Sequence, residues 1–258
     1  MLPVLIQFGP LRIATYGLLV ATAYLVGVLW LKAQRERMGL SESEFWRLIY
    51  SIFFGAIIGG KILFVALNWG DFASGSMGIL RDFRYGFVFF GGFLGATLSG
   101  GLYARRIGKD FLRQADFFAV ATPLGHWIGR LGCLAAGCCY GRPTSLPWAI
   151  RFTHPAALVE NSLVGVPLHP AQLYEAAGEL AIAFVLYRVL NRIQRGAARR
   201  GCAFLGFLVL YSALRFCVEF FRGDDRGAFW LDLSPSQWIA LACALAAGGF
   251  AWRQRNHD

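Results

Sequence analysis

Three cysteines and one arginine stand close together in the stretch GRLGCLAAGCCYGRP, at the end of a long apolar run. The thiols belong to Cys133, Cys138 and Cys139, and the arginine is Arg130. A cysteine supplies a small apolar side chain, a disulfide partner or a nucleophile, and nearby positive charge lowers the pKa of its thiol. The cluster is therefore interpreted either as packing or an extracytoplasmic disulfide between Cys133 and one of the adjacent pair, or as a thiol activated by Arg130 and His126. No spacing typical of metal ligands is evident, because adjacent cysteines with scattered histidines are a weak pattern.

The charged residues around this cluster recur at helical spacing. Four residues follow at i, i+4, i+7 and i+11, within about 60° on one helix face, namely His126, Arg130, Cys133 and Gly137. A similar stripe in a later apolar run comprises Tyr211, Arg215, Glu219 and Arg222. Between them, a third run carries Gln172, Glu175 and Glu179 in its first half. These polar stripes predict three helices that share a polar interface.

Charges inside apolar helices are costly, so they face a partner, a cavity or the bundle interior. Two interpretations of Arg130 and Arg215 remain open. In the first, the two guanidinium groups form a bidentate clamp for a phosphate diester, which a phospholipid presents near that depth. In the second, they pair with Glu175 or Glu219 only to hold the helices together.

The composition places these runs in a membrane. Of the 258 residues, 57% are hydrophobic, more than the 45–50% of ordinary soluble domains. The net charge of +10 comes from basic residues in short loops between apolar runs, which excludes a nucleic-acid-binding stripe and fits orientation in an anionic membrane. No cleaved signal peptide and no internal repeat is evident, so one membrane domain is expected over residues 1–258. Outside the cluster, Cys202, Cys217 and Cys243 are interpreted as small hydrophobes in apolar runs.

Seven segments are long enough to cross the hydrocarbon layer at about 20 residues each. They cover residues 11–32, 48–68, 85–104, 114–139, 170–190, 202–221 and 235–252. Basic residues concentrate in the tail and in the loops after the first, third and fifth segments, whereas the opposite loops hold Arg81, Arg84, Arg142, Arg151, Arg222 and Arg226. The positive-inside rule then predicts an external N-terminus, a cytoplasmic C-terminus and a polar cluster in the outer leaflet.

Glycines gather in the second and third segments, in GAIIGG and FFGGFLGATLSGG. Small residues let membrane helices approach closely, so these two segments are expected to pack tightly against each other.

Several motifs resemble one enzyme family, the prolipoprotein diacylglyceryl transferases. ATYGLLV around Tyr16, GGKILF around Lys61, HPAQLYE from His169 to Glu175 and YSALRFCVEFFR from Tyr211 to Arg222 are similar to family motifs along most of the chain. In the signature Gly-Arg-x-Gly-Asn-Phe-x-Asn-x-Glu-x-x-Gly, this chain keeps Gly129, Arg130, Gly132 and Gly141.

The same signature departs from the family at the polar positions. The asparagines are replaced by Cys133 and Ala136, the phenylalanine by Leu134 and the glutamate by Cys138. The family's His-Gly-Gly has become Phe90-Gly91-Gly92, which removes a candidate base for the acceptor thiol. His126, one turn before Arg130, is a candidate replacement for that base.

The resemblance implies an all-α bundle of about seven transmembrane helices in the bacterial inner membrane. It implies a transferase that moves a diacylglyceryl group from phosphatidylglycerol, or another anionic phospholipid, to the thiol of a lipobox-containing preprotein, without a cofactor or a metal. On the activated-thiol interpretation of the cysteine cluster, which the family does not supply, that cysteine would hold the diacylglyceryl group before passing it on. The expected catalytic residues are Arg130, Arg215, Glu219, His126 and Cys138. The expected substrate-binding residues are Tyr16, Lys61, Cys133, Arg142, His169, Gln172, Glu175 and Tyr211.

Two alternatives to this enzyme remain open. The chain is a divergent paralogue with another lipid donor or acceptor, or a membrane thiol–disulfide protein built on the three clustered cysteines. A transporter is disfavoured, because the sequence has neither an inverted repeat nor matching broken helices.

Overall fold

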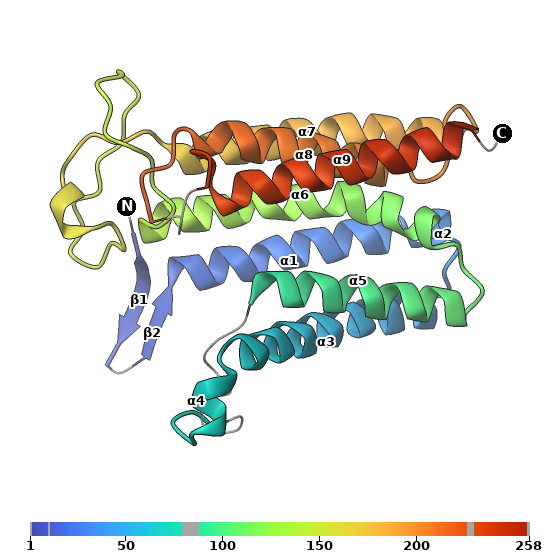
Figure 1. Ribbon diagram of the computed structural model, residues 1–258, viewed down its shortest axis with the longest axis horizontal. Helices are drawn as coiled ribbons and strands as arrows, with labels where there is room; N and C mark the ends of the chain where they lie inside the picture. The colour runs from blue at the N-terminus through green and yellow to red at the C-terminus, as the bar shows by residue number, and fades with distance from the viewer. Residues whose placement is uncertain (1, 10, 79–87, 226–229, 257–258) are drawn as a thin grey trace. The chain divides into compact units, whose positions relative to one another are not determined.

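The computed structural model describes residues 2–9, 11–78, 88–225 and 230–256, and these residues are mostly helical. The seven longest helices within them are α1 (Thr15–Ala33), α3 (Glu42–Leu67), α5 (Phe89–Arg106), α6 (Phe111–Ala136), α7 (Ala171–Gln194), α8 (Cys202–Glu219) and α9 (Pro235–Asn256) (Figure 1). Each overlaps one predicted segment. Among the described helices, α1, α3 and α8 are long and apolar enough to cross a membrane. Arg81, Arg84, Arg226 and the first three residues of the third predicted segment lie outside the described residues.

Several helix boundaries differ from the sequence prediction, and the differences at the start of α1 and the end of α6 change the local structure. The first helix begins at Thr15 and not near residue 11, because β1 (Val4–Phe8) pairs antiparallel with β2 (Leu11–Ala14) in front of it. This short hairpin was not predicted, because the strands continue the apolar run of the helix. The fourth helix, α6, ends at Ala136, so Cys138 and Cys139 belong to the following loop.

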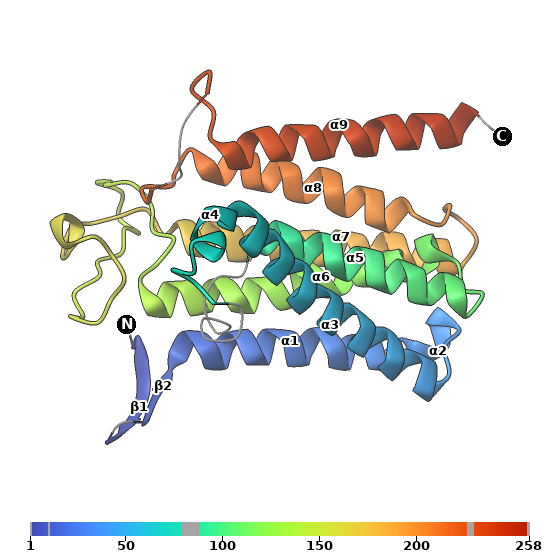
Figure 2. The ribbon, with the colours of Figure 1, turned by 60° about the horizontal axis from the view of Figure 1, so that its bottom comes forward.

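The chain forms two compact units, and the first comprises Met1–Leu31 and Ala115–Asp258. Within it, α1, α6, α7, α8 and α9 lie side by side in both ribbon views (Figures 1 and 2). The buried carboxylate of Asp116 on α6 accepts hydrogen bonds from the backbone N–H groups of Gly201, Ala203 and Phe204. These N–H groups start α8 and have no partner within the helix, so Asp116 both caps α8 and ties it to α6.

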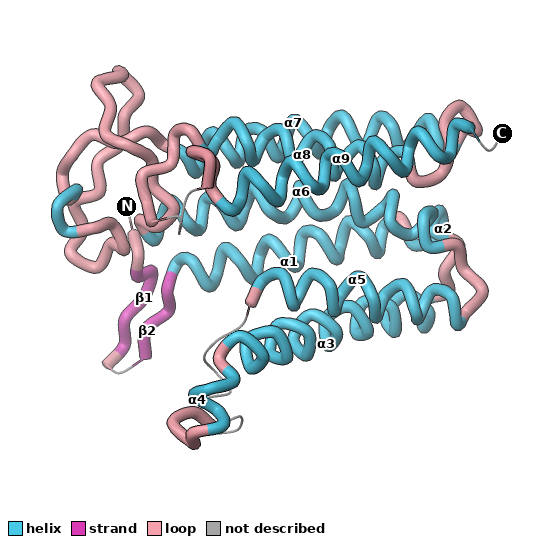
Figure 3. The backbone as a smooth tube through the Cα atoms, in the orientation of Figure 1, coloured by secondary structure: helices cyan, strands magenta, loops and turns pink. Residues whose placement is uncertain are grey.

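A long loop joins the end of α6 to the start of α7 (Figure 3). It has a small apolar core of its own, formed by Tyr140, Phe152, Val159 and Leu168. Gly141 anchors this loop, because its N–H donates to the carbonyl of His169 and it pairs with Arg222 just beyond α8. A Cβ atom at Gly141 would overlap the His169 carbonyl oxygen, so only glycine permits this approach.

The second unit, Lys32–Gln114, contains α2 (Arg35–Met38), α3, α4 (Trp69–Ala73) and α5. As the glycine clusters predict, α3 and α5 pack backbone to backbone. A Cβ atom at Gly95 on α5 would overlap the carbonyl oxygen of Gly55 on α3. Ser51 and Ser99 add a reciprocal pair, in which each hydroxyl donates to the other residue's carbonyl at 3.2 and 2.9 Å. Small residues and hydroxyl bonds are the usual means of holding membrane helices together.

Gly95→Ala should lower the unfolding free energy by about 1–3 kcal/mol, because the added methyl group forces α3 and α5 apart. Gly101→Ala, on the same helix, is the matched control, since its Cβ would meet the Phe111 ring at an ordinary 3.4 Å. Thermal unfolding in detergent measures both. Equal melting temperatures for the two variants would show that the glycine contact does not hold these helices together.

Candidate functional site

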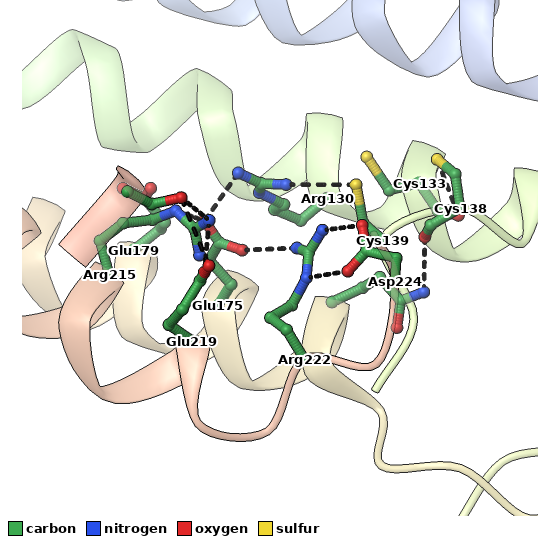
Figure 4. A network of polar contacts seen from close by, with 12 residues as sticks. Arg130, Cys133, Cys138, Cys139, Glu175, Glu179, Arg215, Glu219, Arg222 and Asp224 are labelled. Atoms are coloured by element: carbon green, nitrogen blue, oxygen red, sulfur yellow. Dashed lines mark hydrogen bonds and ion pairs between the residues drawn. The ribbon is translucent and has the colours of Figure 1, made fainter. Parts of the chain in front are cut away.

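The polar stripe of α6 faces α7. His126 pairs with Glu179. Arg130 pairs with Glu175 through an Nη2–Oε1 distance of 2.6 Å (Figure 4). The second pair lies four residues closer to the end of α6 than the first, and four residues closer to the start of α7. This is the register of two antiparallel helices whose faces meet at i and i+4.

Glu175 lies at the centre of the site, and its side chain is fully buried. Besides Arg130, its carboxylate has the Arg215 Nε at 3.9 Å and the Arg222 Nη1 at 3.8 Å. The three guanidinium groups come from α6, from α8 and from the residues just after α8. One carboxylate therefore lies within ion-pair distance of three cations that approach from different parts of the fold.

Arg215 has a second carboxylate, because its Nη2 donates to Glu219 Oε2 at 2.9 Å. The hydroxyl of Ser236 on α9 accepts from the same Nη2 at 3.4 Å and lies 3.4 Å from Glu219 Oε1. Two residues of the predicted α8 stripe, Arg215 and Glu219, thus form an ion pair, and Ser236 on α9 adds a hydroxyl group to it.

Arg130 and Arg215 each retain a buried guanidinium N–H group that has no hydrogen-bond partner among the described residues. These atoms are Nε of Arg130 and Nη1 of Arg215. An unpaired buried N–H group costs free energy unless an acceptor reaches it. Pairing with carboxylates therefore leaves both arginines with unused hydrogen-bonding capacity.

Arg222 links this cluster to the loop. Its Nε and Nη2 bind the Asp224 carboxylate at 2.8 and 2.7 Å, and its backbone carbonyl accepts from Arg142 Nε at 3.0 Å. Burial lowers the pKa of Arg222, but the hydrogen bonds to Asp224 and the nearby charge of Cys139 outweigh it and hold this pKa above its usual value. Arg222 is therefore a permanent cation between the carboxylates and the thiols (Figure 4).

The three clustered cysteines are free thiols, so the disulfide interpretation is not realised in the structure. Their sulfur atoms lie within 4.8 Å of one another. Arg130 Nη1 approaches Cys139 Sγ at 3.9 Å, and Gln172 Nε2 donates to the Cys138 carbonyl at 2.8 Å. Hydrogen bonds from the other two thiols lower the pKa of Cys139, and the charges of Arg222 and Arg130 act in the same direction against burial.

The other expected site residues are more scattered. His169 lies in the loop, where its backbone N–H donates to the Arg142 carbonyl at 2.9 Å and its Nδ1 is 3.2 Å from the Tyr174 hydroxyl. Tyr211 lies beside His126 with ring centroids 6.0 Å apart. Tyr16 on α1 is half exposed and borders Gly132 of α6. Lys61 belongs to the second unit, where it is buried on α3 with its ammonium group 5.2 Å from the Phe64 ring centroid.

Sequence reasoning did not assign five residues of this network to the site. They are Glu179, Arg222, Cys139, Asp224 and Ser236. Glu179 and Arg222 continue the helical stripes and were available from spacing. Asp224 and Ser236 have no such signal, because both follow the end of α8 and reach the site only through the tertiary fold.

Comparisons with known proteins point to one family. Residues 3–253 match the family model described as prolipoprotein diacylglyceryl transferase. The phosphatidylglycerol–prolipoprotein diacylglyceryl transferase of Clostridium tetani is 33% identical, over 93% of each chain. The proteins of the same name from Photobacterium profundum and from Azoarcus sp. are 36% and 35% identical, over 95% and 93% of this chain and 88% and 89% of theirs.

Proposed function

The chain belongs to the prolipoprotein diacylglyceryl transferase family, and on that premise we propose that it is a membrane transferase acting on phosphatidylglycerol. It moves the diacylglyceryl group of this lipid to the cysteine thiol of a lipobox-containing preprotein. The observation that carries the proposal is the pair of buried, unpartnered guanidine donors on Arg130 and Arg215, which an anionic phosphate diester would satisfy.

In this mechanism Arg130 and Arg215 bind the lipid phosphate, while Glu175 and Glu219 hold the two guanidinium groups in place. The acceptor sulfur attacks the C3 carbon of the diacylglyceryl group, a carbon–sulfur bond forms, and the carbon–oxygen bond to the phosphate breaks. The departing glycerol phosphate gains negative charge at the arginines, which stabilise it electrostatically. The thiol proton passes to a general base.

The remaining expected residues support substrate binding. We assign this role to Tyr16, Tyr211 and Gln172, and to Arg142 and His169 in the loop after α6.

His126 is the proposed base, since the family's histidine is Phe90 in this chain. Its Nδ1 is paired with Glu179, which fixes the ring and leaves Nε2 to accept a proton. A carboxylate behind a histidine stabilises the protonated imidazole that forms when the thiol is deprotonated.

We also propose a single membrane domain of seven spans in the bacterial inner membrane, with the N-terminus outside and the C-terminus in the cytoplasm. The support is the excess of arginine in alternate loops. This orientation places the loop after α6, and the arginine cluster beside it, at the outer leaflet.

Reporter fusions test the orientation. Fusions at residue 108 and at the C-terminus should report the cytoplasm, and fusions at residues 75 and 155 should report the outside. A cytoplasmic signal at residue 155 would put the arginine cluster in the wrong leaflet and overturn the proposal.

Arg130→Ala and Arg215→Ala should each lower turnover by about 100-fold or more, because each removes a donor from the developing phosphate charge. Arg130→Lys should also be impaired, since an ammonium group keeps the charge but cannot donate the two parallel hydrogen bonds of a planar guanidinium group. Release of glycerol phosphate from phosphatidylglycerol in the presence of a lipobox peptide measures the rate.

Arg188→Ala, an exposed position further along α7, is the matched control and should turn over as wild type does. Full turnover by a folded Arg130→Ala or Arg215→Ala protein would show that this arginine only holds helices together and does not bind the lipid phosphate.

His126→Asn should lower turnover by about 100-fold, because asparagine keeps a hydrogen bond but cannot accept the thiol proton. The measurement is turnover against pH for this variant, with Phe90→His as the comparison. An unchanged rate and profile in His126→Asn would make this histidine structural, and a gain from Phe90→His alone would place the missing base at position 90.

A further inference from the structure

The end of α6 is a Schellman turn that brings Cys133 and Cys138 together. The Cys138 N–H donates to the Cys133 carbonyl at 3.2 Å, the Gly137 N–H donates to the Leu134 carbonyl at 3.3 Å, and Gly137 is left-handed with φ 80°. In such a turn the residue after the glycine lies against the residue five positions earlier. Cys133 and Cys138 are five positions apart in the sequence, and they come together because the helix ends between them.

Cys139 completes the cluster through its own backbone. It is one of the few described residues other than glycine with a positive φ, at 61°. A left-handed cysteine costs free energy, so the fold holds this residue in a conformation it does not prefer. The result is that all three sulfur atoms lie within 4.8 Å of one another, with Cys133 buried and the other two partly accessible.

This separation fits a shared metal ion. Zinc–thiolate bonds are about 2.3 Å long, so two sulfur atoms on one ion lie roughly 4 Å apart. The observed separation of up to 4.8 Å is close to that distance. Thiolates are soft ligands that select Zn²⁺ and Cu⁺ over hard cations such as Mg²⁺.

The surrounding charges also match a metal–thiolate complex. Arg130 approaches Cys139 at 3.9 Å, and Arg222 carries a positive charge beside the same thiol. A bare cation would be repelled there. Three thiolates, however, give a complex of net charge −1 with Zn²⁺ or −2 with Cu⁺, and two guanidinium groups stabilise that anion.

From these observations we propose that Cys133, Cys138 and Cys139 form a binding site for one thiophilic cation, Zn²⁺ or Cu⁺. On binding, the three thiols release their protons to solvent. The ion ties the end of α6 to the loop that carries Gly141 and Arg142, and it keeps a coordination position open for water or a further thiol. Because the ion occupies the thiol of Cys138, this cysteine is not the carrier of a transferred lipid group.

The test uses the purified full chain in detergent, reduced and stripped of metal. Titration with Cd²⁺ should give a thiolate charge-transfer absorption that saturates at one ion per chain, and elemental analysis after Zn²⁺ or Cu⁺ loading should give the same ratio. Of the six cysteines, the three of the cluster should become protected from a thiol reagent. Each of Cys133→Ser, Cys138→Ser and Cys139→Ser should lower the affinity at least about tenfold.

Cys217→Ser is the matched control, since Cys217 is an exposed cysteine on α8, and it should bind as wild type does. X-ray absorption of the wild-type zinc protein should show three sulfur ligands at about 2.3 Å, which settles the site even if a cluster variant fails to fold. A shell of nitrogen and oxygen alone, the absence of stoichiometric binding, or equal loss in Cys217→Ser would overturn the proposal.

The ion site does not depend on the transfer reaction. Arg215→Ala removes a proposed phosphate ligand and leaves the cysteines untouched, so it should bind one ion per chain while it fails to release glycerol phosphate. Failure of the transferase proposal is thereby separated from failure of the metal site.

Discussion

The buried carboxylate of Glu175 is the interaction on which the site depends. It is fully buried on α7, and Arg130, Arg215 and Arg222 all lie within ion-pair distance of it. A buried charge without a partner costs several kcal/mol, whereas a charge with well-placed partners is tolerated. Any packing of α6, α8 and the following residues that separates the arginines from Glu175 is therefore penalised. The register of the helices and the position of the guanidinium groups are two consequences of the same constraint.

The second constraint is the way α6 ends. Its Schellman turn places the thiols beside Arg130 and directs the chain into Gly141, which contacts His169 and pairs with Arg222. Because Arg222 also lies near Glu175 and binds Asp224, the loop and the carboxylate cluster share one arginine. The contact of Arg130 with Cys139 and that of Gln172 with Cys138 join the loop to the site as well.

Much of the helical part could be predicted from the sequence, because it follows from periodicity. The stripe from His126 to Gly137 and the stripe from Tyr211 to Arg222 identify the faces that meet, and the glycine clusters identify the contact between α3 and α5. The hairpin before α1 could not be predicted, since its strands are as apolar as the helix. The thiol cluster could not either, because it depends on one left-handed glycine and one left-handed cysteine. Asp224 and Ser236 lie outside any periodic pattern, and only the tertiary fold shows that they reach the arginines.

The unfolding free energy of Glu175→Gln in detergent is the most direct test of the central role of Glu175. Glutamine keeps the size of the side chain and removes the charge that faces Arg222, which is buried, and Arg130 and Arg215, which are partly buried, so the loss should be about 3–5 kcal/mol. Glu160→Gln, at an exposed position of the same unit, should change the value by less than about 0.5 kcal/mol. A Glu175→Gln protein as stable as the Glu160→Gln control would show that the arginines are held by other contacts.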